Sequence, residues 1–123
     1  GVRCVESPAL VQRLAALRMP LTVCPLSNVK LCVFPALAQH NLEALLDAGL
    51  CATVNSDDPA YFGGYINENF VQTFDALPAL TARHAHQLAA NSFEASFMDA
   101  AHNHSKPNKC GPNLCSTLFA ATA

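Results

Sequence analysis

The chain has 123 residues, of which 51% are hydrophobic and 13% are charged, and its formal net charge is -2 at pH 7. The few charges form no basic patch, which excludes an electrostatic footprint for nucleic acid, and no apolar run approaches the roughly 20 residues that cross a membrane. Average soluble domains are about 25% charged, so we expect other protein to cover some faces of this chain. No signal-peptide pattern opens the sequence, which predicts a cytoplasmic protein without a nucleic-acid or membrane partner.

The first third of the sequence predicts a helix, a strand and a turn. Ser7 and Pro8 suit the N-cap and first position of a helix, which Pro20 ends. The run 21–24 is short and apolar, which is typical of a buried strand, and residues 25–28 predict a turn that leaves it. The first few residues of the chain are a candidate for a further strand.

A second helix and a second buried strand follow. Gly49 suits the left-handed conformation that ends a helix, and the leucines that predict this helix are Leu37, Leu42, Leu45 and Leu46. His40 lies near the middle of this stretch and is expected on its solvent side. Residues 50–54 predict a strand roughly 30 residues after the first, the length of a βαβ unit, so we expect a parallel sheet covered on both faces.

Two more helices are predicted after a flexible loop at Gly63 and Gly64, with Asn67 and Thr81 as their N-caps. Their packing residues are Phe70, Val71, Phe74 and Leu77 in the first, and Ala85, Leu88, Ser92, Phe93 and Phe97 in the second. From about Asp99 onward, the hydrophobic residues no longer recur at helical spacing. The sequence therefore predicts one structured region over 1–98 and an irregular or disordered tail over 99–123.

The predicted elements do not form a closed fold. Two or three parallel strands leave both edges of a sheet open, and a (β/α)8 barrel takes about 250 residues, about twice the length of this chain. We therefore predict an α/β fold that is the C-terminal portion of a (β/α)8 TIM barrel and is incomplete on its own.

The cysteines do not predict a disulfide framework. Four of them lie among apolar residues, where a free thiol behaves as a small apolar side chain: Cys4, Cys24, Cys32 and Cys51. Without a secretory signal, we expect these four to be reduced.

Several histidines are weak candidates for metal binding. His102 and His104 have a suitable spacing, but no strand orients them, and the spacing of the nearby Cys110 and Cys115 is a poor match to zinc sites. His84 and His86 are two residues apart on a predicted helix, so they face different ways and are expected in surface or packing roles.

The strongest candidate for chemistry is the segment Ser56-Asp57-Asp58-Pro59, directly after the second strand. Sites of parallel α/β folds assemble at the carboxyl ends of strands. Pro59 ends the strand, and the adjacent carboxylates leave it in different directions, one toward a metal and the other toward a ligand. A polar turn that caps the next helix is the alternative, and the spacing alone favours it.

The longer sequence motifs around this segment favour a functional site over a polar turn. Residues 54–64, VNSDDPAYFGG, strongly resemble the last-strand motif of the adenosine/adenine deaminase family, and residues 24–28, CPLSN, resemble its preceding strand motif at a fitting interval. Residues 91–97, NSFEASF, resemble the terminal helix of these enzymes. The YFGG extension and residues 67–69, NEN, look more like the adenine-acting branch than the adenosine-acting one. The resemblance covers residues 1–98.

The resemblance implies an amidohydrolase-type barrel with one zinc ion, in which water displaces the exocyclic amine of a purine base. It implies that Asp57 is a zinc ligand through one carboxylate oxygen, and that Asp58 binds the substrate by accepting a hydrogen bond from the imidazole side of the purine. Zinc lowers the pKa of its water, and a fixed carboxylate would orient the resulting hydroxide. Ser27 and Asn28 are expected near the same mouth, either shaping the loop or contacting the substrate.

Much of the family's catalytic centre precedes the matching region. Its His-x-His pair, third histidine ligand and proton-shuttling glutamate lie upstream, and a further histidine stands immediately before a segment like Gly1-Val2-Arg3. We therefore expect a fragment of an enzyme that hydrolyses adenine to hypoxanthine and ammonia, inactive alone, with the N-terminal half of the barrel as its partner. The alternatives are a truncated binding or regulatory module and an incomplete gene product without activity. The choice between adenine and adenosine stays open, as does the oligomeric state.

Overall fold

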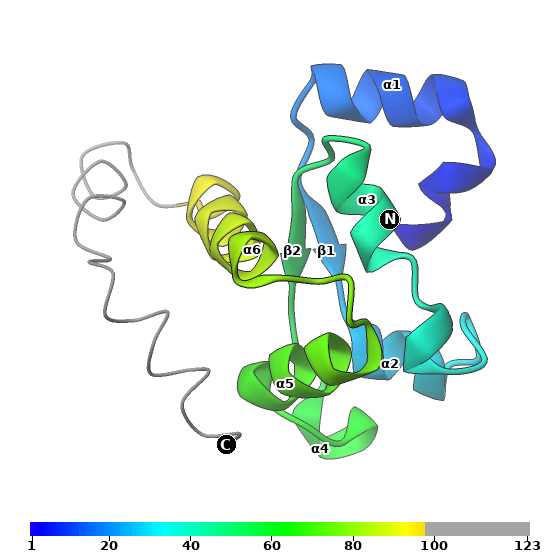
Figure 1. Ribbon diagram of the computed structural model, residues 1–123, viewed down its shortest axis with the longest axis vertical. Helices are drawn as coiled ribbons and strands as arrows, with labels where there is room; N and C mark the ends of the chain where they lie inside the picture. The colour runs from blue at the N-terminus through cyan, green and yellow to red at the C-terminus, as the bar shows by residue number, and fades with distance from the viewer. Residues whose placement is uncertain (98–123) are drawn as a thin grey trace.

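The computed structural model describes residues 1–97, in which helices alternate with two short strands (Figure 1). The 3-10 helix η1 (Val2–Glu6) and helix α1 (Pro8–Ala16) come first. Strands β1 (Leu21–Val23) and β2 (Ala52–Val54) are separated by α2 (Pro25–Lys30), the 3-10 helix η2 (Leu37–Gln39) and α3 (Leu42–Asp47). After β2 come α4 (Pro59–Phe62), α5 (Ile66–Ala76) and α6 (Ala82–Glu94). The predicted tail over 99–123 lies outside the described residues.

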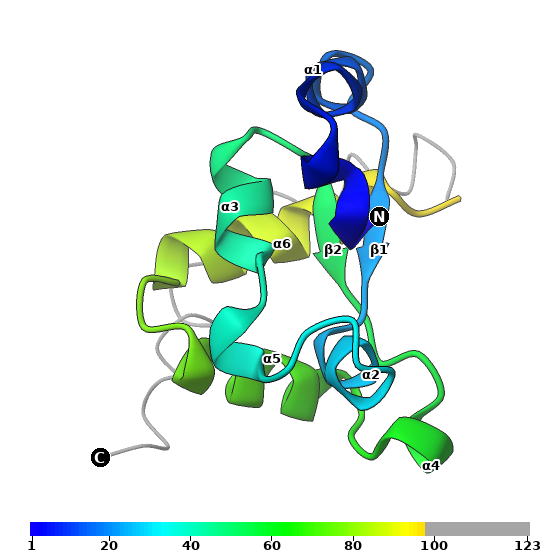
Figure 2. The same ribbon diagram turned by 90° about the vertical axis from the view of Figure 1, so that its right-hand side faces the viewer.

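The two strands form a parallel pair, as predicted, with Leu21 opposite Ala52 and Val23 opposite Val54. Helices α3 and α6 lie over the same face of this pair, as Figures 1 and 2 show together. On the other face, Thr22 of β1 is exposed, whereas its neighbour Thr53 on β2 is buried. Within the described part of the chain, the expectation of cover on both faces is therefore confirmed along β2, which is buried throughout, and is not met on β1 at Thr22.

The core lies between the sheet and the two helices that cover it. Leu42 and Leu45 of α3 and Leu88 of α6 are fully buried and pack with Val23 and Ala52. Burial of one such leucine contributes about 2 kcal/mol to stability. Among the helices of residues 1–97, none has the length and hydropathy needed to span a bilayer.

The structure confirms three of the predicted helix ends. The Ser7 side chain accepts a hydrogen bond of 3.4 Å from the backbone N–H of Leu10 at the start of α1. Gly49 follows α3 with a φ of 73°, in the left-handed region. Thr81 is the N-cap of α6, and its backbone N–H donates to Nδ1 of His84 over 3.0 Å. These ends follow from short-range hydrogen bonding, which local sequence encodes.

The start of the chain is a 3-10 helix, so the expected third strand is wrong. The backbone N–H of Cys4 donates to the carbonyl of Gly1, and that of Ser7 donates to the carbonyl of Cys4, each over 3.0 Å. Val2 and Cys4 are buried while the residues between and beside them are exposed. This alternation resembles that of a strand, which explains the error.

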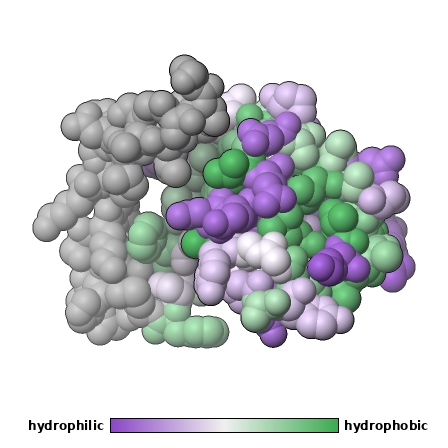
Figure 3. All heavy atoms as spheres, turned by 90° about the horizontal axis from the view of Figure 1, so that it is seen from below, coloured by the Kyte–Doolittle hydropathy of each residue, from purple (hydrophilic) through white to green (hydrophobic). Residues whose placement is uncertain are grey.

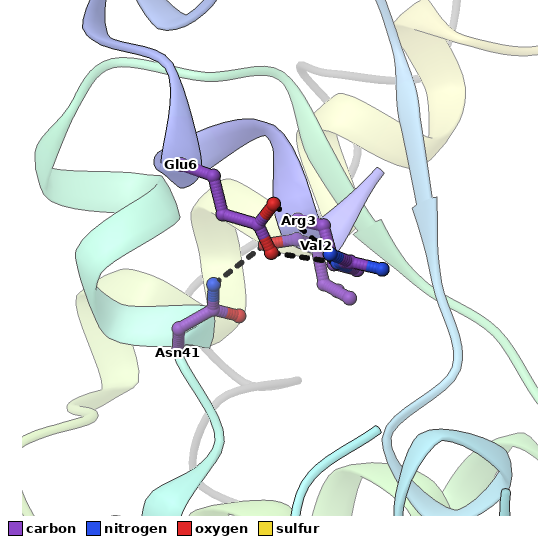
Figure 4. Close-up of polar contacts among 4 residues, drawn as sticks. All are labelled: Val2, Arg3, Glu6 and Asn41. Carbon is purple, nitrogen blue, oxygen red and sulfur yellow. Dashed lines mark hydrogen bonds and ion pairs between the residues drawn. The ribbon is translucent and has the colours of Figure 1, made fainter.

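A side-chain contact fixes η1 against the start of α3 (Figure 4). Nδ2 of Asn41 donates a hydrogen bond of 2.8 Å to the backbone carbonyl of Val2. The ion pair between Arg3 and Glu6 beside it spans 2.6 Å and is exposed to solvent. Exposed pairs contribute little to stability, so Asn41 is the residue that ties the two elements together.

Three other predictions differ from the structure. Residues 25–28 begin helix α2 rather than forming a turn, because Pro25 occupies a first helical position, where its missing N–H is not needed. Asn67 is not a cap but lies inside α5, which begins at Ile66. Phe93 and Phe97 do not pack in the core; both are exposed, and Phe97 lies beyond the end of α6.

The four cysteines within residues 1–97 are free thiols, as predicted. Cys4 and Cys51 are buried and Cys24 is half-buried. Cys32 is exposed and adopts a φ of 57°, because the chain turns back directly after α2. The expectation that it packs among apolar residues is therefore wrong.

Candidate active site

The candidate site residues gather where the two strands end. Helix α2 follows β1 directly, α4 follows β2 after a short turn, and both lie at the lower end of the molecule in Figure 1, opposite α1. Helix α5 contacts α2 at the same end. Figure 3 views this end and shows hydrophilic residues gathered beside hydrophobic ones. It is the end at which parallel α/β folds assemble their sites.

Asp57 is held by a residue from the preceding strand's end. The buried Ser27 donates a hydrogen bond of 2.7 Å from its Oγ to Oδ2 of Asp57. Among residues 1–97, the other carboxylate oxygen, Oδ1, has no hydrogen-bond partner. The side chain is exposed, and the backbone has a φ of 59°, a left-handed conformation that aspartate tolerates better than most residues. One oxygen is thus fixed while the other is free to bind a ligand.

The thiol of Cys24 lies beside Asp57. Its pKa is raised, first by burial and then by the negative charge of Asp57, while a hydrogen bond from the backbone of Asp57 acts in the opposite direction. A raised pKa favours the protonated thiol, which is a poorer nucleophile than the thiolate. Cys24 therefore contributes packing beside the carboxylate.

Asp58 performs the capping role that the spacing alone suggested. Its Oδ1 accepts hydrogen bonds from the backbone N–H groups of Ala60, at 3.0 Å, and Tyr61, at 3.2 Å. These contacts make Asp58 the N-cap of the four-residue helix α4. Oδ2 makes no hydrogen bond within the described residues. The cap orients this carboxylate and occupies only one of its oxygens, so the capping role does not conflict with the expected substrate contact.

Asn69 ties the start of α2 to the loop before α5. It is fully buried, and its Oδ1 accepts a hydrogen bond of 3.2 Å from the backbone N–H of Leu26. Its Nδ2 donates to the carbonyls of Tyr65, at 2.9 Å, and Gly64, at 3.4 Å. Asn69 belongs to the NEN segment, whose resemblance to the adenine-acting branch does not reveal this structural role. The role comes from contacts between segments that are distant in the sequence.

Gly64 lies close to α2 at the same place and has a backbone conformation that favours glycine. A Cβ on this residue would lie 2.7 Å from Cδ1 of Leu26, and its φ is 123°. Both features disfavour any other residue. The predicted loop at Gly63 and Gly64 is therefore a specified contact with α2.

His40 is buried, so its expected place on the solvent side is wrong. Only 4% of its surface is exposed, and its ring packs against Phe34 with centroids 4.5 Å apart. Nε2 lies 3.1 Å from Oδ1 of Asn28, and Nδ1 accepts a hydrogen bond of 3.1 Å from the backbone N–H of Leu42. Burial lowers the pKa of His40 to about 4.

The two motif residues Ser27 and Asn28 lie at the mouth, as expected. Each has a protein partner, Asp57 for Ser27 and His40 for Asn28. Their side chains therefore shape this end of the molecule. These contacts agree with the expected shaping of the loop, and contact of either residue with the substrate stays a prediction.

Residues 1–97 hold no group of three or more histidine, cysteine, aspartate or glutamate side chains able to bind a metal. Asp57, with one free carboxylate oxygen, fits a zinc ion as a single ligand, whereas zinc sites use three or four protein ligands. His84 accepts a hydrogen bond at the start of α6, which agrees with its expected packing role, and His86 is exposed. The polar segment with His102, His104, Cys110 and Cys115 lies outside the described residues.

Comparison with known proteins identifies the family. The model of the family "Adenosine deaminase" matches residues 1–106. The adenine deaminases of Geotalea uraniireducens and Albidiferax ferrireducens are 66% and 70% identical to this chain over 99 residues. Each match covers 80% of this chain and 28% of the relative. The chain thus spans less than a third of the length of these relatives.

Solved structures show the same fold. The adenine deaminase of Arthrobacter aurescens matches with a TM-score of 0.81 and 48% identity, over 85% of this chain and 32% of that one. An amidohydrolase from Burkholderia ambifaria, with bound Zn, matches with a TM-score of 0.79 and 19% identity, over 98% of this chain and 34% of that one. The α/β fold is therefore part of a TIM barrel like that of the adenine deaminase, as predicted. The chain belongs to the adenosine deaminase family.

Proposed function

We propose that this chain forms the C-terminal part of a barrel that hydrolyses adenine to hypoxanthine and ammonia, with Asp57 as a zinc ligand and Asp58 as a substrate contact. The observation that carries the proposal is the hydrogen bond from Ser27 to Oδ2 of Asp57, which leaves Oδ1 free at the carboxyl end of β2. The relatives with 62–70% identity are named adenine deaminases, which favours adenine over adenosine.

In this proposal the chain's own residues bind and orient. Asp57 would hold the metal through Oδ1, while Ser27 fixes the other oxygen. Asp58 would accept a hydrogen bond from the five-membered ring of the purine through Oδ2, while its Oδ1 stays bound to α4. Zinc, when bound, lowers the pKa of water and so supplies a nucleophile at neutral pH. Water replaces the amine on the purine ring, and the amine leaves as ammonia.

The remaining ligands and the proton-transfer groups would come from the N-terminal part of the barrel. One carboxylate neither holds zinc nor activates water, because catalytic zinc sites use three protein ligands and an open position. The N-terminal part of the barrel is therefore the proposed partner of this chain. The face of the sheet on which Thr22 is exposed would lie toward it.

A hybrid enzyme tests this proposal. Residues 1–97 replace the matching C-terminal segment of the Geotalea uraniireducens adenine deaminase, which is 66% identical over 99 residues. The zinc-loaded hybrid should consume adenine, whereas the chain alone should not. The loss of adenine is measured by its ultraviolet absorbance. An inactive hybrid that is folded and binds zinc would contradict the proposal, as would turnover by the chain alone.

The hybrid also tests the role of Asp58. Asp58→Asn keeps an oxygen that can cap α4 but removes the negative charge, so KM for adenine should rise about tenfold or more. Asp75→Asn is the matched control, because Asp75 is exposed on α5. Equal KM values for the two variants would remove Asp58 from the substrate site.

A further inference from the structure

The hydrogen bonds of His40 fix it in one neutral tautomer. The backbone N–H of Leu42 donates to Nδ1, so that nitrogen carries no proton. The proton of the neutral ring is therefore on Nε2, which donates to Oδ1 of Asn28 over 3.1 Å. With 4% of its surface exposed, the ring has no access to alternative partners in water. His40 thus links the start of α3 to α2 through two separate atoms.

Helix α2 depends on such contacts for its position. It has only six residues, too few for a helix to be stable by itself. Three consecutive residues each make one contact to another segment: Leu26 to Asn69, Ser27 to Asp57, and Asn28 to His40. The contact of Ser27 reaches the candidate metal ligand, and the contacts on either side of it hold the same turn of helix.

The segment after α2 contacts both Asn28 and His40. The backbone carbonyl of Asn28 accepts hydrogen bonds from the N–H groups of Val33, at 2.9 Å, and Phe34, at 3.4 Å. Phe34 in turn packs against the His40 ring. Loss of the bond between His40 and Asn28 would therefore loosen both the end of α2 and the turn that follows it.

We propose that His40 is a positioning residue for Asp57: through Asn28 it holds α2 so that the Ser27 hydroxyl stays hydrogen-bonded to the carboxylate. The proposal rests on the proposed role of Asp57 as a zinc ligand. His40 touches neither metal nor substrate in this account. It acts on the direction of the carboxylate, and a ligand must be held close to its productive geometry for the metal site to work.

Two substitutions of His40 each keep one of its two hydrogen bonds and remove the other. Asparagine places an acceptor near the position of Nδ1 and so keeps the bond from Leu42, but it does not reach Asn28. Glutamine places an amide donor near the position of Nε2 and keeps the bond to Asn28. A role confined to capping α3 predicts that His40→Gln is the damaging change, whereas positioning through α2 predicts that His40→Asn is.

Hydrogen exchange on the full chain tests the link without catalysis. The amides to follow in α2 are those of Asn28 and Leu31, which donate to Cys24 and Ser27. We expect His40→Asn to speed their exchange about tenfold, the effect of losing one hydrogen bond, and His40→Gln to leave it near the unmodified rate. The amide of Leu45 in α3 should exchange at the same rate in His40→Asn as in the unmodified chain. Unchanged α2 exchange in His40→Asn would overturn the proposal.

The zinc-loaded hybrid provides the second readout. His40→Asn should lower kcat about tenfold at an unchanged KM for adenine, His40→Gln should restore most of it, and Asn28→Ala should reproduce the loss with His40 in place. Equal losses in both His40 variants, or a full kcat in His40→Asn, would overturn the proposal. If the unmodified hybrid is inactive, the proposed function fails, while hydrogen exchange still decides whether His40 holds α2.

Discussion

Ser27 donates a hydrogen bond of 2.7 Å to Oδ2 of Asp57, and this contact joins the segments that follow the two parallel strands. The serine comes from α2, after β1, and the aspartate from the turn after β2. The two residues are 30 positions apart in sequence. The bond therefore depends on the crossover that brings the strand ends together, and it fixes one side of the carboxylate.

Removal of this bond should impair the zinc-loaded hybrid. Ser27→Ala leaves Oδ2 of Asp57 without its buried donor, and we expect kcat to fall about tenfold, since hydrogen bonds to charged groups contribute about 1.5–3 kcal/mol. Ser92→Ala, an exposed serine on α6, is the control with unchanged kcat. Steady-state kinetics on adenine makes the comparison. Equal kcat values for the two variants would show that Ser27 does not orient Asp57.

Gly64 and Gly63 form a matched pair for stability. Both have positive φ, so alanine is strained at either position, and more so at Gly64, whose φ of 123° lies further from the left-handed region than the 74° of Gly63. A Cβ at Gly64 would also meet Leu26, whereas nothing lies within 4 Å of one at Gly63. We expect Gly64→Ala to lower the free energy of unfolding by about 1–2 kcal/mol more than Gly63→Ala, measured by urea denaturation. The opposite order would contradict the close approach of this loop to α2.

Asn69 should be far more sensitive to substitution than Asn67, although both lie on α5. Asn69→Ala removes three hydrogen bonds and leaves the buried N–H of Leu26 without a partner. The expected loss is about 3 kcal/mol in the free energy of unfolding. Asn67 is exposed, and its replacement by alanine should change stability by less than about 0.5 kcal/mol. Similar free energies of unfolding for the two variants would contradict the role of Asn69 in tying α2 to the loop before α5.

The stability of the chain should fall at mildly acidic pH because of His40. Its pKa is lowered by burial from 6.5 to about 4, so the unfolded chain takes up a proton below pH 6.5 that the folded chain does not. The stabilisation is complete above pH 6.5 and is lost as the pH falls toward about 4. We expect the protonation of His40 on unfolding to lower the free energy of unfolding by about 2 kcal/mol between about pH 7.5 and about pH 5.

His40→Gln provides the control for that pH dependence, because glutamine does not titrate. The free energy of unfolding of the unmodified chain relative to this variant should be constant above about pH 6.5, fall as the pH is lowered to about 4, and level off below that. Denaturant unfolding across this range measures it. A pH-independent difference would show that the ring is already protonated in the folded chain or never becomes so on unfolding.

Much of the fold was predictable because it is encoded locally. The parallel strands followed from two short apolar runs at βαβ spacing, and the caps at Ser7, Gly49 and Thr81 followed from residue types that satisfy helix ends. The start at Val2 was misread because a 3-10 helix can show the same alternation of burial as a strand.

The site was predictable in part. The motif around Asp57 pointed to the right end of the sheet, and the CPLSN string placed Ser27 beside it. The roles of His40 and Asn69 were not predictable, because each depends on a partner that is distant in sequence or on burial that no local pattern reveals. A polar residue that bonds two segments looks, in sequence, like a polar residue on a surface.

The zinc content of the hybrid tests the central claim most directly. Asp57→Ala removes the only side chain within residues 1–97 that is proposed as a zinc ligand, while Asp75→Ala changes an exposed carboxylate on α5. The account predicts that metal analysis finds about one zinc per molecule in the unmodified hybrid and in Asp75→Ala, and that Asp57→Ala loses at least tenfold in zinc affinity together with adenine turnover. An Asp57→Ala hybrid that keeps both its zinc and its turnover would contradict the account.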